Sequence, residues 1–189
     1  MSRKFSIRPA LTFKGRQFKG LRGWAGKPFH PPLTDIPVAA YVLVAVFDVI
    51  SRIAGNDSSI GRDFFISGTH VIIAGAIVSL GAALTGFWDW WRSTESGNQA
   101  RRTANWHMTV MLTVTAIVIV DVIIRLAQWG NNEATSALVM ILSLIVGGLT
   151  VFGATYGGSL AFDYGFNVET AGDSPVWHES EVDVFPGQK

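Results

Sequence analysis

Four blocks of about twenty mainly apolar residues recur along the chain and constrain its fold more than any other feature. They lie at Ile36–Ala54, Ile66–Trp90, Trp106–Gln128 and Ser136–Tyr156. Each block can cross a hydrocarbon core of about 30 Å as a helix that rises about 1.5 Å per residue. The blocks lack the alternation of polar and apolar residues that is typical of membrane barrels. The sequence therefore predicts an all-α integral membrane protein, a bundle of four transmembrane helices.

The composition agrees with this fold class. Charged residues make up 15% of the chain, against about 25% in soluble domains, and hydrophobic residues make up 49%. The chain has no cysteine, so it cannot form a disulfide, a thiolate metal site or an iron–sulfur cluster by itself. Redox chemistry would therefore require another cofactor or a partner protein.

Basic residues are distributed unevenly between the two sides that four spans create. One side receives Arg3, Lys4, Arg8, Lys14, Arg16, Lys19, Arg22, Lys27, Arg92, Arg101 and Arg102. The other side receives only Arg52, Arg62 and Arg125. By the positive-inside rule, we expect a multi-pass membrane protein with both termini and the loop between the second and third spans in the cytoplasm.

The chain divides into three segments. Residues 1–34 form a basic arm that contains aromatic residues and is expected to lie on anionic lipid, although a tail that only fixes the topology is the alternative. Residues 35–158 form the transmembrane domain, and residues 159–189 form an acidic tail that could dock a partner. Nothing in the chain resembles a reader of nucleic-acid bases.

An internal repeat indicates that the bundle consists of two tandem helical hairpins. The segments Asp48–Ala54 and Asp121–Ala127 match at five of seven positions. Each is followed, one helix later, by two glycines five residues apart, namely Gly81 with Gly86 and Gly148 with Gly153. Small residues let helices approach closely in lipid, so these four glycines are predicted to face other helices. The two copies have the same orientation across the membrane.

Both copies carry an aspartate and an arginine spaced i to i+4, which places the two side chains on one helix face. The pairs are Asp48 with Arg52 and Asp121 with Arg125. They are predicted to be structural ion pairs in the last helical turns, where an arginine can reach the headgroups. A path for protons is the alternative, because ionisable residues in a membrane are often functional.

Polar side chains gather at the other ends of the helices. His30 precedes the first block, with Thr34 as its expected N-cap. His107 lies in the first turns of the third block, and Asp89 ends the second. His30 and His107 could ligate haem b or, with Asp89, a metal. The alternative is that each histidine is a hydrogen-bonding cap. His70 is predicted to be structural, without a partner at its depth.

Several ordered motifs resemble a bacterial family of predicted membrane proteins, domain of unknown function 2231. They are Gly26–Val38, Gly86–Trp90, Ala100–Arg102 followed by His107, and Gly157–Phe162, and the resemblance covers about residues 26–168. Some relatives carry a Rieske iron–sulfur domain after the four helices, which implies work near membrane electron transfer. This chain differs from them because it has no cysteine. The resemblance implies a functional site at His30, Asp89 and His107, and no particular reaction.

Two functional hypotheses follow. The first is an accessory or anchoring subunit of a membrane electron-transfer assembly, which is not an enzyme by itself, contacts respiratory or other redox subunits, and binds haem b or contacts quinone at the cytoplasmic face. The second is a structural membrane scaffold that holds partner proteins or lipids without a cofactor. A small transporter is disfavoured because no helix is visibly broken at mid-depth.

Overall fold

The fold is a bundle of four long antiparallel helices. The computed structural model describes residues 20–21, 28–131 and 134–168. The helices are α1 (His30–Ala54), α2 (Ser59–Ser93), α3 (Gln99–Gln128) and α4 (Ala137–Phe162), and the 3-10 turn η2 (Trp129–Asn131) follows α3. All four helices are long and apolar enough to cross a membrane. The predicted all-α transmembrane fold class is confirmed.

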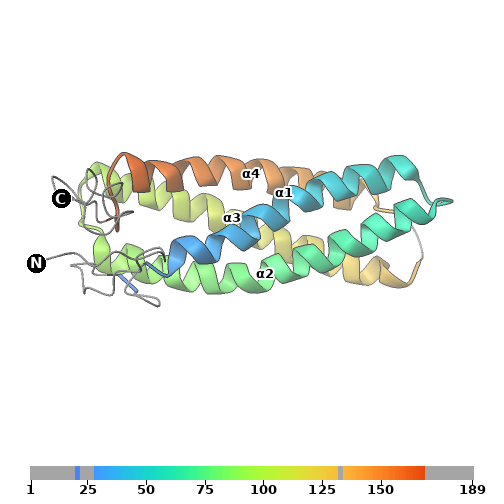
Figure 1. Cartoon of the computed structure of the whole chain (residues 1–189), viewed down its shortest axis with the longest axis horizontal. Coiled ribbons are helices and arrows are strands. Elements are labelled where there is room, and N and C mark those ends of the chain that lie inside the picture. Colours follow the sequence, from blue (N-terminus) through green and yellow to red (C-terminus); the bar gives the residue numbers. More distant parts are fainter. Residues whose placement is uncertain (1–19, 22–27, 132–133, 169–189) are drawn as a thin grey trace, which may run out of the picture.

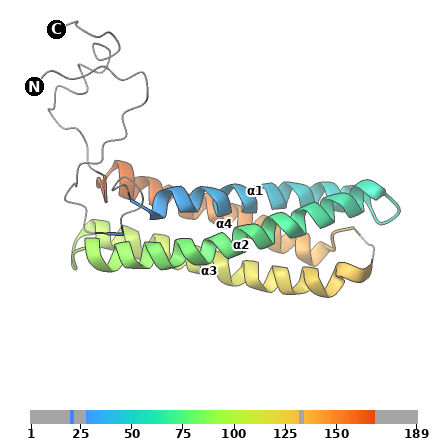
Figure 2. The same ribbon diagram turned by 60° about the horizontal axis from the view of Figure 1, so that its bottom comes forward.

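The helices form a square in which α1 and α3 lie on one diagonal. Helix α1 packs against α2 and α4, and α3 packs against the same two helices. The α1–α2 and α3–α4 connections lie together at one end of the bundle, which we call the hairpin end (Figure 1). The start of α1, the α2–α3 connection and the end of α4 lie at the opposite end, which we call the entry end (Figures 1 and 2). Side chains of α1 and α3 therefore meet across the bundle axis.

The outside of the bundle is more apolar than a soluble bundle would tolerate. Its central core consists mostly of small and β-branched residues, namely Ala40, Tyr41, Val44, Ile72, Val114, Val118 and Val146. Large aliphatic side chains point outward instead, with Ile77, Leu84 and Ile123 exposed at 67%, 74% and 61%. Only a hydrocarbon environment removes this surface from water, so the faces between the two ends lie against lipid.

Helix α1 begins four residues earlier than its predicted N-cap. His30 is its first residue, and the following prolines occupy the first turn, where a missing N–H costs nothing. Thr34 is therefore not the cap: it lies inside the helix, and its Oγ1 donates to the Pro31 carbonyl at 2.7 Å. This early start brings His30 into the helical bundle rather than into a preceding loop.

Three of the four glycines predicted to face other helices do so. A Cβ added at Gly86 would lie 2.6 Å from the His30 ring, one at Gly153 would lie 2.6 Å from Met111 Sδ, and one at Gly81 would lie 3.4 Å from Leu33. Gly148 differs from the prediction, because an added Cβ there would meet nothing within 4 Å. Gly148 therefore lies on an open face of α4.

Candidate functional site

His30 joins α1 to α2 near the entry end. Its Nδ1 lies 2.9 Å from the Ala82 carbonyl and 3.3 Å from Thr85 Oγ1. The ring rests on Gly86, where any side chain would collide with it. Because a carbonyl oxygen only accepts, Nδ1 carries the proton of this bond, and Nε2 keeps its lone pair. His30 is therefore fixed in orientation and in tautomer.

His107 repeats this arrangement between α3 and α4. Its Nδ1 lies 2.9 Å from the Gly153 carbonyl, and its Cε1 would lie 3.2 Å from a Cβ added at Gly157. Each histidine therefore bonds one backbone carbonyl, of Ala82 or Gly153, and lies against the glycine four residues later, Gly86 or Gly157. The two hairpins are therefore copies at this end, but Gly86 corresponds to Gly157, four residues beyond the Gly153 that the repeated glycine pairs align with it.

The two imidazoles approach each other from the diagonal helices. Their ring centres are 6.5 Å apart, and the ring planes cross at 84°. Both rings hold Nδ1–H on a carbonyl, which is the usual outer hydrogen bond of a histidine that ligates a metal through Nε2. The structure therefore brings His30 and His107 together across the bundle axis.

Asp89 is buried near the same end but has a different partner. It is 3% exposed, and its Oδ1 accepts the backbone N–H of Leu21 at 2.8 Å. The Leu21 carbonyl in turn accepts the N–H of Phe29 at 3.1 Å. No cluster of three His, Asp or Glu side chains in the described ranges could hold a metal ion. The predicted three-ligand metal site is therefore not formed, and Asp89 fastens the chain preceding α1 onto α2.

Removal of the Asp89 carboxylate should free the backbone N–H of Leu21 without unfolding the helices. A hydrogen bond to a charged group contributes about 1.5–3 kcal/mol. We therefore expect the Leu21 amide to exchange with deuterium about ten- to a hundredfold faster in Asp89→Ala, with unchanged exchange in the middle of α1. Asp89→Asn keeps an acceptor oxygen and should show a smaller increase. Equal exchange at Leu21 in all three proteins would refute this docking role.

A second buried cluster occupies the hairpin end. Arg125 of α3 donates from Nε to Asp121 Oδ1 at 3.2 Å and from Nη2 to Asp48 Oδ2 across the bundle. All three side chains are fully buried. The other oxygen of Asp48 accepts from Thr135 Oγ1 at 3.0 Å. One guanidinium therefore ties the two hairpins together through the diagonal helices.

Only one of the two predicted i to i+4 pairs exists. Asp121 pairs with Arg125 as expected. Asp48, however, is bonded by Arg125 and Thr135, while Arg52 is exposed on the surface of α1. Ser51, which sequence analysis did not single out, strengthens the same end: it donates to the Gly61 carbonyl at 2.6 Å and accepts the Thr135 N–H at 2.9 Å.

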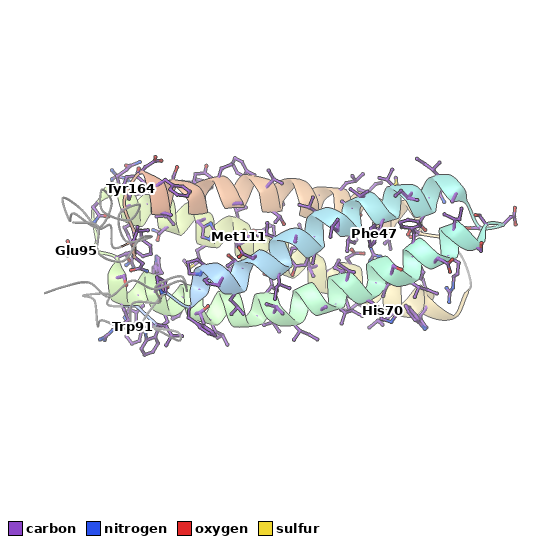
Figure 3. The ribbon with its side chains drawn as sticks, viewed as in Figure 1. Phe47, His70, Trp91, Glu95, Met111 and Tyr164 are labelled. Atoms are coloured by element: carbon purple, nitrogen blue, oxygen red, sulfur yellow. The ribbon has the colours of Figure 1, made fainter. Side chains whose placement is uncertain are left out.

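His70 has a partner, contrary to the sequence prediction. Its ring meets the Trp129 ring edge-on, with the centres 5.3 Å apart. His70 lies on α2 toward the hairpin end (Figure 3), and Trp129 belongs to η2. No periodic pattern signals this contact, because Trp129 lies beyond the end of α3.

The fold and its two polar clusters define a four-helix multi-pass membrane protein with paired, partly buried histidines at one end and a buried, shared arginine at the other. The chain belongs to the family described as predicted membrane protein, domain of unknown function 2231, whose sequence model matches residues 26–170. Searches of curated proteins and of solved structures found no match. The family description names no reaction, so the function has to be argued from the site.

Proposed function

We propose that the chain is a membrane subunit of an electron-transfer assembly and that it holds haem b between His30 and His107. The observation that carries this proposal is the meeting of two oriented imidazoles from diagonal helices. In a helical bundle, such opposed side chains on facing helices are the usual way to build a cofactor site in the core.

The spacing of the two rings would suit one metal ion held by both of them. An imidazole binds a metal at about 2.0–2.1 Å, and its ring centre lies about 1.1 Å behind the ligating nitrogen, so opposed imidazoles have centres about 6 Å apart. The observed 6.5 Å agrees with this value. The carbonyls of Ala82 and Gly153 orient the rings, and Gly86 and Gly157 keep side chains away from them. When bound, haem supplies a reversible one-electron carrier.

The position of the pair suggests where electrons would be exchanged. His30 and His107 lie toward the entry end, on the same side as the basic segments that the positive-inside rule assigns to the cytoplasm. A redox partner, or a quinone at that interface, would meet the bundle on this face of the bacterial inner membrane. The chain's own residues would hold, orient and insulate the carrier, and they would leave substrate chemistry to the partner subunits.

An absorbance spectrum tests the proposal directly. The purified full-length protein, supplied with haem during expression, should show a Soret band that shifts on addition of dithionite. His30→Ala and His107→Ala should each lose most of this band, because both rings would hold the haem. His70→Ala is the matched control and should keep it. A colourless wild-type protein, or a band that survives both substitutions in folded protein, would rule the haem site out.

A structural scaffold is the second candidate, and one observation favours it. The two Nδ1 bonds already join the helices of each hairpin, to Ala82 and to Gly153, so the histidines have a role in packing without a cofactor. In this case the protein is colourless and copurifies with partner proteins or lipids in fixed ratio. His30→Ala and His107→Ala then lower the melting temperature, whether or not haem is supplied.

A further inference from the structure

A shallow groove lies between α2 and α3 at the hairpin end, away from both buried clusters. It is lined by His70, Ile73, Leu126 and Trp129 and has a volume of about 240 Å³. The groove is open to the surroundings, since His70 is exposed and Leu126 is 54% exposed. Because the flanks of this bundle lie against lipid, the molecules that reach the groove first are lipids.

An arginine contacts Trp129, one of the residues that line this groove. Arg62 is the fourth residue of α2, and its Nη2 donates to the Trp129 carbonyl at 3.0 Å. The guanidinium carbon lies 5.8 Å from the centres of both the Phe65 and the Trp129 rings. Its Nη1 is buried and has no hydrogen-bond partner. Within the described residues, no carboxylate pairs with Arg62, whereas Arg125 has two.

The order of these groups along the membrane normal matches the order of groups in a phospholipid. Arg62 lies in the first turn of α2, near the end of the span. His70 is eight residues further along the helix, about 12 Å deeper. An arginine that pairs with no carboxylate among the described residues therefore lies at headgroup depth, with His70 deeper along α2 and the apolar side chains of Ile73 and Leu126 lining the same groove.

We propose that this groove binds an anionic phospholipid, with its phosphate on Arg62 and one acyl chain along Ile73 and Leu126. Arginine is the preferred partner of phosphate because its fork of N–H donors matches the phosphate oxygens. Aromatic rings at the interface, here Phe65 and Trp129, hold the guanidinium in place from below. The neutral ring of a quinone would leave the charge of Arg62 without a counter-ion. This proposal does not depend on the haem site.

The test compares lipids of different charge on the detergent-purified full-length protein. Native mass spectrometry should show phosphatidylglycerol bound more tightly than phosphatidylcholine, and Arg62→Gln should weaken that binding about tenfold, as expected for the loss of one charge-assisted contact. Arg52→Gln removes an exposed arginine from the same end and should bind like the wild type. Leu126→Trp, which fills the groove and keeps Arg62, should also weaken binding.

Four results would overturn the proposal. The first is equal binding of phosphatidylglycerol and phosphatidylcholine by the wild type. The second is unchanged phosphatidylglycerol binding in both Arg62→Gln and Leu126→Trp, each with a melting temperature close to that of the wild type. The third is displacement of the bound lipid by a stoichiometric amount of quinone, which would assign the groove to that ligand instead. Displacement by millimolar inorganic phosphate alone would show that the acyl chain contributes nothing, and would also overturn it.

Discussion

Replacing Arg125 with methionine should destabilise the bundle by about 3–5 kcal/mol, because it leaves two buried carboxylates without their shared cation. Asp48 and Asp121 reach this guanidinium from α1 and from α3, and all three side chains are fully buried. Methionine fills a similar length without replacing either charged contact. The loss should therefore come from uncompensated charge, and it should separate the two hairpins at the hairpin end first.

The free energy of unfolding in mixed micelles, measured by titration with a denaturing detergent, provides the check. Arg52→Met is the matched control at the repeated position, and it should change stability little because Arg52 is exposed. The triple variant Asp48→Asn, Asp121→Asn, Arg125→Met should recover most of the loss, since removing every charge of a buried cluster costs less than removing one. A single variant as stable as the wild type would contradict the argument.

The span of each helix could be predicted from the sequence because hydropathy depends on local composition. The four apolar blocks lie within α1 to α4, apart from Ser136, which precedes α4. The position of Thr34 could not be assigned correctly, because Pro31 and Pro32 tolerate both a loop and the first turn of a helix. The sequence gives the residue types at such a boundary, but packing decides where the helix begins.

The sequence could not show that Arg125 bonds both aspartates while Arg52 is exposed, and the reason is different. Asp48 and Arg52 have the same spacing as Asp121 and Arg125, yet only Arg125 turns inward. Its Nη1 would lie 3.4 Å from a Cβ added at Gly68, so a glycine on α2 provides the space. Thr135 occupies the remaining oxygen of Asp48. Neither Gly68 nor Thr135 belongs to the repeated motif, so the repeat alone could not show which arginine is shared.

The histidine pair could be predicted, but its supporting residues were aligned in the wrong register. The two glycine pairs spaced five residues apart match Gly86 to Gly153, whereas the contacts of the histidine rings match Gly86 to Gly157. A slip of four residues is about one helical turn and keeps the same face toward the neighbour, so both alignments satisfy the pattern of small residues. Only the contacts of the His30 ring with Gly86 and of the His107 ring with Gly157 show which alignment is correct.

Gly86→Ala should displace His30 and thereby disrupt the histidine pair. The new Cβ would lie 2.6 Å from Cε1 and 2.9 Å from Nδ1 of the ring, which is closer than real Cβ contacts come. The ring cannot retreat and keep its bond to the Ala82 carbonyl, because Nδ1 makes that bond at 2.9 Å. Overpacking of this kind costs about 1–3 kcal/mol. If haem is bound, the Soret band should fall to the level of His30→Ala.

Two other glycines separate this effect from a general cost of adding a methyl group. Gly158→Ala meets open space and should be neutral or slightly stabilising, because alanine favours the helix. Gly153→Ala meets Met111 Sδ at 2.6 Å and Val110 at 3.1 Å, and the flexible methionine can move aside where the hydrogen-bonded ring cannot. The loss of stability should therefore decrease from Gly86→Ala to Gly153→Ala to Gly158→Ala. If Gly86→Ala proves as stable as Gly158→Ala, then the His30 ring is free to move, and Gly86 and the Ala82 carbonyl do not fix its orientation.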